Sequence, residues 1–183
     1  MENVASQPGQ VVWTIGHSTW SLEELGALLR ENGVQRLVDV RTVPRSRHNP
    51  QFNAETLPQD LAAQEISYTH MAALGGLRHA RKDSMNTGWR NANFRGYADY
   101  MQTSEFDHGL HELMALAGEQ TAAIMCAEAV PWRCHRLLIA DALTVRGIEV
   151  RHIMGPAKWQ VHKLTPFALV KGTHLSYPFV LDA

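Results

Sequence analysis

The chain has few cysteines and no long apolar run, and each of these shortages excludes a class of protein. Two cysteines among 183 residues cannot make the disulfide framework of a small secreted domain, so we expect a reducing, cytoplasmic location. No stretch approaches the roughly 18 consecutive apolar residues of a membrane-spanning helix. The N-terminal segment carries an acid and no apolar run, unlike a secretory signal. We therefore expect no membrane partner.

An excess of charge of either sign is also missing, because the formal net charge is −1. Any contact with nucleic acid must then come from a local basic patch. Of the 17 basic residues, thirteen are arginine and four are lysine, and residues 41–95 carry a net charge of +4. Arginine is favoured where planar anions are held by forked hydrogen bonds. The composition thus favours an anion-binding segment, although arginines scattered over a solvated surface would give the same count.

The apolar pattern predicts a single α/β domain with its own core. Helical patterns separate five short apolar runs, which lie at residues 11–15, 36–40, 66–71, 121–126 and 148–153. This alternation predicts a mostly parallel five-stranded sheet with helices on both faces, a Rossmann-like three-layer architecture. We assign residues 1–10 to a flexible N-terminal segment and 11–183 to the domain, with 77–118 as a loop and helical insertion. Residues 157–183 are predicted to add a short helix and an edge strand.

Local signals predict where helices begin. Ser21 and Glu24 form a capping box, in which each side chain accepts a hydrogen bond from a free backbone N–H. Thr56 is the predicted cap of the next helix, and Ser104 restarts the helical pattern inside the insertion. Pro131 is predicted to open the helix that follows the fourth strand.

Polar residues follow the predicted strands at their carboxyl ends, where open α/β sheets bind ligands. We therefore predict one site at this edge, with His17, Arg41, Glu128 and His135 around a single pocket. The candidate anion-binding residues are Ser18, Asp39, Arg41, Arg45, Ser46, Arg47, Arg133 and Arg136. The candidate catalytic residues are Cys134, Cys126, Glu128, His17 and His135. An alternative for Arg41 is an ion pair with Asp39 or Glu128.

The two cysteines are the candidate nucleophiles. A helix opened by Pro131 would place Cys134 in its first turn, where backbone amides and flanking arginines lower a thiol pKa. Cys134 is therefore the favoured reactive thiol, whereas Cys126 ends an apolar strand and could be a core residue. Glu128, His17 or His135 would then transfer protons.

Three other chemistries are weaker. The Cys-x-Glu…Pro-x-x-Cys-His spacing differs from that of zinc deaminases, because the second Cys-x-x-Cys pair is missing. A metal held by His17, Cys126, Cys134 and His135 would need two adjacent helical residues, which point about 100° apart, to converge. A Cys126–Cys134 disulfide lacks thioredoxin-type spacing. We therefore predict no metal and no cofactor, with the metal site and the disulfide as less favoured alternatives.

Several of these segments together resemble the family called domain of unknown function 488. The resemblance runs from Trp13 to about Met154, with a further short similarity at Tyr177-Pro178. It implies a compact α/β domain whose motifs share one site, and it supplies no reaction. The segments that carry it are Thr14-Ile15-Gly16-His17-Ser18, Leu37-Val38-Asp39-Val40-Arg41, Pro44-Arg45-Ser46-Arg47, Phe52-Asn53, Leu74-Gly75-Gly76, Met125-Cys126-Ala127-Glu128 and Cys134-His135-Arg136.

Two functions from different classes are compatible with this pattern. The favoured one is a small enzyme, a hydrolase or transferase, acting on a nucleotide, nucleic acid or other phosphorylated compound at a Cys/His/Glu/Arg pocket. The alternative is a non-catalytic module that binds nucleic acid or a ligand, with Trp89, Phe94 and Tyr97 for stacking. The sequence does not indicate an oligomeric state.

Overall fold

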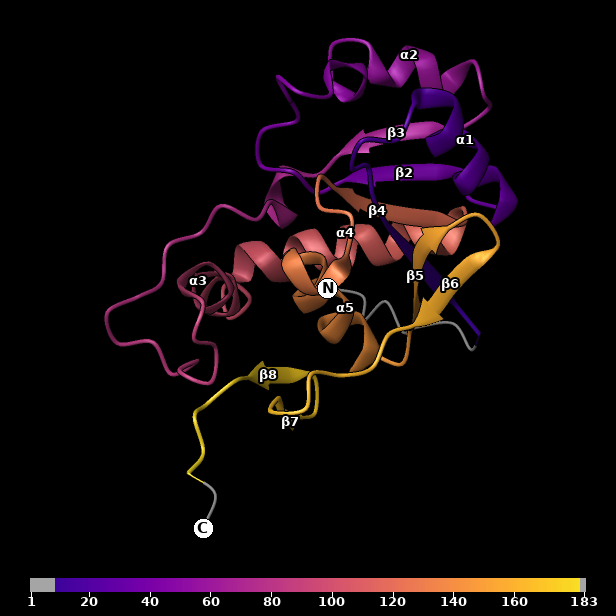
Figure 1. Cartoon of the computed structure of the whole chain (residues 1–183). Coiled ribbons are helices and arrows are strands. Elements are labelled where there is room, and N and C mark those ends of the chain that lie inside the picture. The colour runs from indigo at the N-terminus through magenta and orange to yellow at the C-terminus, as the bar shows by residue number, and fades with distance from the viewer. Residues whose placement is uncertain (1–8, 182–183) are drawn as a thin grey trace.

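The computed structural model describes residues 9–181, so most of the predicted N-terminal segment lies outside the described residues. A six-stranded sheet forms the centre of the molecule, in the order β3-β2-β4-β1-β5-β6 (Figure 1). Its first five members are parallel, and β6 pairs antiparallel with β5. The strands are β1 (Val11–Gly16), β2 (Arg36–Asp39), β3 (Ser67–His70), β4 (Ala122–Cys126), β5 (Glu149–Gly155) and β6 (Lys158–Val161). The predicted single-domain, mostly parallel α/β fold is confirmed, with one strand more than expected.

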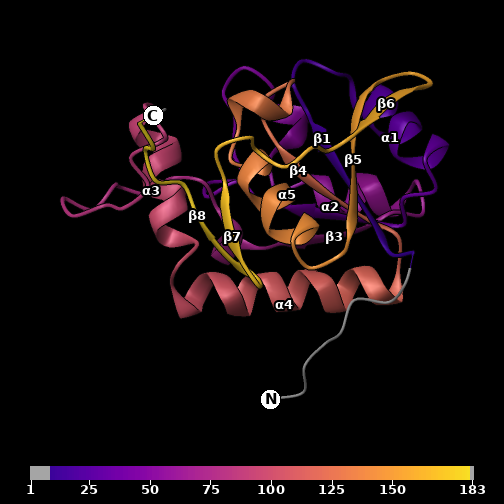
Figure 2. The ribbon, with the colours of Figure 1, turned by 90° about the horizontal axis from the view of Figure 1, so that it is seen from below.

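Helices cover both faces of the sheet, as the alternating pattern predicts. One apolar cluster joins the sheet to α1 (Leu22–Glu31) and α2 (Leu57–Ala62). A second cluster joins the opposite face to α3 (Ala92–Tyr100), α4 (Ser104–Glu119) and α5 (Arg136–Thr144), which Figure 2 shows from below. Short 3-10 helices lie at η1 (Pro50–Phe52), η2 (Ala72–Leu74) and η3 (Pro131–Arg133).

The C-terminal region differs from the prediction. Its strands are β6, β7 (Leu169–Lys171) and β8 (His174–Ser176), and no helix follows α5 within the described residues. The chain reverses after β5 through Ala157, which has a positive φ of 52°. This turn folds β6 back onto β5 as a hairpin, so the predicted short helix is replaced by strand pairing. Across residues 9–181, no helix has both the length and the apolar character needed to span a membrane.

The predicted helix starts agree only in part with the structure. The capping box at Ser21 and Glu24 is present, with both hydrogen bonds at 3.1 Å. Thr56 makes no side-chain cap, and Thr103, rather than Ser104, caps α4. The prediction that Pro131 opens a long helix is wrong. That proline opens only the 3-10 turn η3. Cys134, the residue after this turn, has an extended backbone, and α5 begins at Arg136.

Strand register places two polar side chains on one face of the sheet. Successive residues of a strand point to opposite faces. Met125 packs with α1 and α2, so Cys126 faces α5, and on the neighbouring strand Thr14 faces the same way. Gly16 of β1 pairs with Cys126 of β4. The N-terminus of α5 therefore lies over both Thr14 and Cys126.

Candidate functional site

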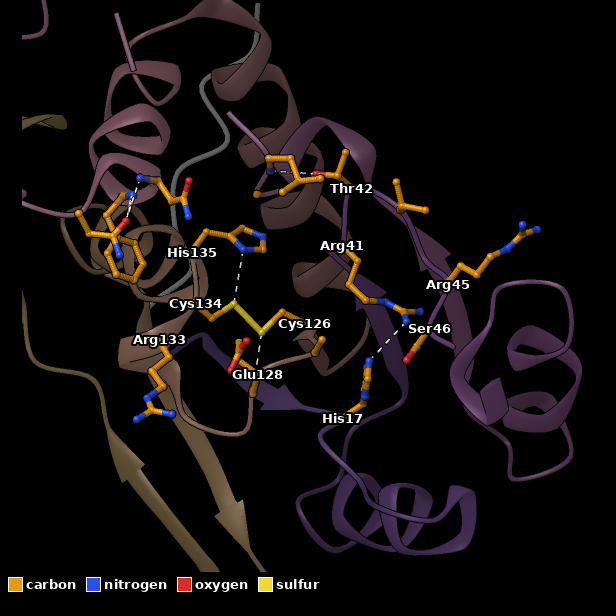
Figure 3. A pocket seen from close by; sticks show the side chains of 17 residues that line it. His17, Arg41, Thr42, Arg45, Ser46, Cys126, Glu128, Arg133, Cys134 and His135 are labelled. Atoms are coloured by element: carbon orange, nitrogen blue, oxygen red, sulfur yellow. Dashed lines mark hydrogen bonds between the residues drawn. A yellow bond between two sulfur atoms is a disulfide. The ribbon is translucent and has the colours of Figure 1, made fainter. Parts of the chain in front are cut away.

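A cavity of about 390 Å³ opens at the carboxyl ends of β1, β2 and β4 (Figure 3). Nine of the predicted site residues line it: His17, Arg41, Arg45, Ser46, Cys126, Glu128, Arg133, Cys134 and His135. Thr42, Asn91, Asn93 and Phe94 also line it, and of these only Phe94 is a candidate from the sequence. The geometry brings the four side chains expected around one pocket together, while their chemical roles stay predictions.

Four predicted residues lie outside the cavity lining. Ser18 and the exposed Arg47 do not contact it, and Asp39 and Arg136 are buried behind its wall. Of the aromatic residues considered for stacking, only Phe94 reaches the cavity. Tyr97 is fully buried, and Trp89 packs against Phe167 and Tyr177.

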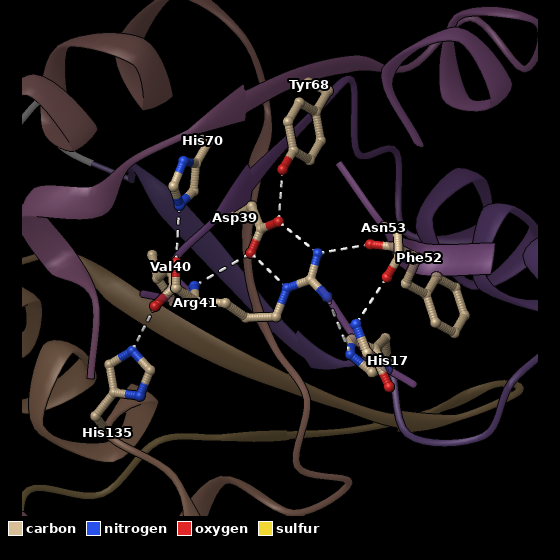
Figure 4. Close-up of polar contacts among 10 residues, drawn as sticks. His17, Asp39, Val40, Arg41, Phe52, Asn53, Tyr68, His70 and His135 are labelled. Atoms are coloured by element: carbon tan, nitrogen blue, oxygen red, sulfur yellow. Dashed lines mark hydrogen bonds and ion pairs between the residues drawn. The ribbon is translucent and has the colours of Figure 1, made fainter. Parts of the chain in front are cut away.

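Arg41 is held by Asp39 in a buried, bidentate ion pair (Figure 4). Its Nε and Nη2 donate to the two carboxylate oxygens at 2.9 and 2.7 Å, and Nη2 also donates to the carbonyl of Phe52. Tyr68 donates its hydroxyl to the same carboxylate at 2.6 Å, and burial together with Asp39 raises the pKa of Tyr68. The ion pair predicted as the alternative for Arg41 is therefore present, and it leaves mainly Nη1 for other contacts.

His17 is the group that Nη1 of Arg41 faces, at 3.4 Å from the His17 Nε2. The imidazole stacks on Phe52 and uses Nδ1 to donate to the carbonyl of Ser18 at 2.9 Å. Since Nδ1 carries the proton, Nε2 is an acceptor turned towards Arg41. Burial lowers the pKa of His17, so the imidazole is neutral at physiological pH.

Cys126 and Cys134 form a disulfide in the cavity wall. The less favoured pairing of the sequence is thus the one observed, and the prediction that Cys134 occupies the first turn of a helix is wrong. The cause is the loop between β4 and η3, which folds back over Gly16. A Cβ on that glycine would lie 1.6 Å from the Glu128 carbonyl oxygen. The return of this loop brings residue 134 beside residue 126.

Arg136 lies beneath this pair, fully buried at the first position of α5. Its Nε donates to the Cys126 sulfur at 3.0 Å, Nη1 to the Thr14 hydroxyl at 2.9 Å and Nη2 to the Glu128 carbonyl at 2.8 Å. None of the ion pairs within residues 9–181 includes it. Burial lowers the pKa of Arg136 to about 9, so the guanidinium remains charged near neutral pH.

His135 lies on the other side of Cys134. Its Nε2 donates to the Val40 carbonyl at 2.8 Å, which leaves Nδ1 as an acceptor 3.4 Å from the Cys134 sulfur. Burial lowers the pKa of His135 to about 4, so this imidazole is neutral. A Cβ on Gly76 would lie 2.5 Å from the same Nδ1, so any side chain at position 76 would clash with the imidazole.

Three backbone amides, those of residues 127–129, follow β4 beside the cavity, and Ala127 and Glu128 line it. The carbonyls of Cys126 and Ala127 accept from the amides of His17 and Ser18, and the Glu128 carbonyl accepts from Arg136. Because C=O and N–H point in opposite directions across a trans peptide, the amides of residues 127–129 point away from β1. No acceptor among residues 9–181 receives a hydrogen bond from them. Successive free amides that point the same way can together bind an anion.

The donor set does not favour a metal. Within the described part of the chain, no cluster of three or more His, Cys, Asp and Glu side chains is arranged to hold a metal ion. The predicted metal alternative needs His17, Cys126, Cys134 and His135. Here the two sulfurs bond to each other and the two imidazoles donate to backbone carbonyls.

The fold and site define an α/β-domain protein with a cationic, cysteine-containing pocket at the carboxyl edge of its sheet. The chain belongs to the family described as domain of unknown function DUF488, whose model matches residues 21–143. The resemblance drawn from the sequence is thereby confirmed. No curated protein and no solved structure matches the chain.

Proposed function

We propose that the chain is a small enzyme that acts on an anionic substrate through a cysteine nucleophile, Cys126, in the reduced state. The observation that carries the proposal is the contact between Cys126 and the buried Arg136, at 3.0 Å. A buried cation without a close counter-charge is costly, and within residues 9–181 no carboxylate lies within ion-pair distance of Arg136. The Glu128 carboxylate acts on it only from a longer distance. A thiolate on Cys126 would supply that charge, and a neighbouring cation lowers a thiol pKa.

The second cysteine has the opposite environment. In the reduced protein the thiol of Cys134 would donate to Nδ1 of His135, which is neutral at physiological pH. A neutral imidazole stabilises the thiol rather than the thiolate. This asymmetry supports Cys126 as the nucleophile and Cys134 as its disulfide partner, which reverses the order favoured by the sequence.

The pocket lining supports an anionic substrate. Asp39 neutralises most of the charge of Arg41, and the exposed Arg45 pairs with Glu55. Arg133 is therefore the one arginine of the described lining that none of the ion pairs within residues 9–181 includes. The free amides of residues 127–129 lie beside the nucleophile, where they would stabilise negative charge that develops during the reaction. A cavity of about 390 Å³ suits a small phosphorylated molecule or one nucleotide of a longer chain.

The reaction would proceed in two steps. The Cys126 sulfur forms a bond to the electrophilic atom of the substrate, and the bond to the leaving group breaks with its electron pair. Glu128, the only carboxylate in the described pocket lining, would give the leaving group a proton and then take one from water. That water attacks the covalent intermediate and restores the thiolate. The disulfide form, in which neither sulfur is free, would be inactive.

Site-resolved alkylation tests the nucleophile. The chain is reduced and treated with iodoacetamide between pH 5.5 and 9.5, and each cysteine is quantified by peptide mass spectrometry. We expect Cys126 to label with a midpoint at least about one pH unit below the free-thiol value of about 8.5. Arg136→Lys should raise that midpoint, whereas Arg146→Lys, just beyond the C-terminal end of the same helix, should not. Equal midpoints for Cys126 in wild type and Arg136→Lys would overturn the assignment.

Turnover separates the enzyme from a binding module. Reduced protein is assayed against nucleotides, phosphate monoesters and phosphodiesters, with Cys126→Ser and Cys134→Ser as paired variants. We expect turnover that Cys126→Ser abolishes and Cys134→Ser retains, together with slower alkylation in millimolar phosphate. Phosphate protection without turnover of any of these compounds would favour the non-catalytic module instead.

A further inference from the structure

A chain of buried hydrogen bonds leads from Arg136 away from the pocket. Arg136 donates to the Thr14 hydroxyl at 2.9 Å, and that oxygen lies 2.6 Å from Nδ1 of His152. Nε2 of His152 lies 2.9 Å from Nδ1 of His162, whose Nε2 lies 2.7 Å from Asp141. All five side chains are buried, and segments far apart in the sequence supply them.

The carboxylate at the far end is held in a fixed position. One oxygen of Asp141 accepts from His162 and from the Thr165 amide at 3.0 Å, and the other accepts from the Tyr177 hydroxyl at 2.8 Å. An ionised carboxylate only accepts hydrogen bonds, so Nε2 of His162 must carry a proton.

The same logic assigns the remaining protons. Burial lowers the pKa of His152 to about 3, so this imidazole is neutral and carries one N–H. The Thr14 oxygen already accepts from Arg136, and its own proton has no acceptor among the described residues except Nδ1 of His152. If that nitrogen donated instead, the hydroxyl proton would be buried without a partner, which is unfavourable. The proton of His152 therefore lies on Nε2, and it is donated to His162.

We propose that Thr14, His152, His162 and Asp141 form a positioning network that holds the Arg136 guanidinium against Cys126. Every donor in the network points one way, from Arg136 towards Asp141. Because the Thr14 hydroxyl proton is directed at His152, a lone pair of the Thr14 oxygen faces Nη1 of Arg136 and accepts its hydrogen bond. This inference rests on the proposed function for its consequence, the stabilisation of the Cys126 thiolate. Thr14 is the critical member, because it joins the arginine to the histidine pair.

Thr14→Val removes the hydroxyl and keeps the β-branched shape that suits a strand. The matched control is Thr165→Val, since the Thr165 hydroxyl is also buried but has no hydrogen-bond partner among the described residues. We expect Thr14→Val to raise the midpoint of Cys126 alkylation by about one pH unit, which lowers the labelling rate at pH 7 by about three- to eightfold for a wild-type midpoint of about 6.5 to 7.5. Thr14→Ser should restore it, and Thr165→Val should leave it unchanged.

A second measurement does not depend on the thiol. Long-range proton–nitrogen spectra of histidine-labelled wild type should show His152 and His162 as neutral Nε2–H tautomers at pH 7. Thr14→Val should shift the His152 Nδ1 resonance. A proton on Nδ1 of His152, or equal alkylation midpoints for Thr14→Val and Thr165→Val, would overturn the network. A wild-type midpoint of about 8.5 with the expected tautomers would instead refute the nucleophile while the hydrogen-bond assignment stands.

Discussion

The Asp39–Arg41 ion pair supports the strongest stability prediction, because the same chain contains a nearly perfect control. Asp39 is 0 % and Arg41 7 % exposed, and the two paired residues lie two positions apart in the sequence. Arg81 and Asp83 have the same sequence separation and a similar paired geometry, but they are 70 % and 73 % exposed. Asp39→Asn and Asp83→Asn are therefore the same chemical change in two environments.

The expected magnitude follows from the four hydrogen bonds that the Asp39 carboxylate accepts. Three come from Arg41, through its amide, Nε and Nη2, and one comes from Tyr68. In asparagine, an NH2 group replaces one of the two carboxylate oxygens, so it would face two of these four hydrogen-bond donors instead of accepting from them. The guanidinium also loses its counter-charge. Removal of one partner from a buried pair costs about 3–5 kcal/mol.

Urea unfolding at pH 7, monitored by tryptophan fluorescence, measures this cost. We expect Asp39→Asn to lower the unfolding midpoint strongly with an unchanged m-value, whereas Asp83→Asn should have almost no effect because solvent screens exposed pairs. If the two variants lose the same stability, the buried pair does not hold the strand-to-loop junction as the geometry indicates.

Three further predictions test the pocket wall. Gly16→Ala should destabilise the fold by about 2 kcal/mol or more, since its Cβ would overlap the Glu128 carbonyl, whereas Gly118→Ala meets open space and should be neutral or stabilising in the same urea assay. Arg45→Ala should reduce the rise in melting temperature that millimolar phosphate produces, and Arg47→Ala, outside the lining, should not. For His135 the pKa falls from 6.5 to about 4 on folding, so stability is complete above pH 6.5 and about 3 kcal/mol is lost as pH falls towards 4. His135→Gln should flatten that pH dependence of the urea midpoint, and an unchanged slope would contradict the assignment.

Much of the fold could be predicted because its signals are local. Alternating apolar runs and helical faces depend on neighbouring residues, so the five parallel strands and the capping box at Ser21 were accessible from the sequence. The carboxyl-edge rule then placed His17, Arg41 and Glu128 around one pocket without any knowledge of contacts. This rule does not predict the charge or the hydrogen bonds of each side chain, such as the neutralisation of Arg41 by Asp39.

The missed features depend on long-range register. Thr14 and His152 are 138 residues apart in sequence and meet only because β1 and β5 pair with Thr14 opposite His152. Asn91 and Asn93 line the cavity from a segment with no periodicity. The geometry of the Pro131 turn was also inaccessible, because a proline sets one φ angle and does not determine whether the helix continues.

Arg136 links the proposed nucleophile, Cys126, to the disulfide seen in the structure. A thiolate on Cys126 gives this buried cation a counter-charge, and the disulfide removes that charge and leaves only neutral acceptors. If Cys126 is a thiolate as proposed, the arginine stabilises the reduced state relative to the oxidised one, as a cation near an active-site thiolate does in strongly oxidising dithiols. The same contact that supports Cys126 as a nucleophile thus favours reduction of its bond to Cys134. A reducing environment would then keep the pair open, while an oxidant would close the pocket wall and block the reaction.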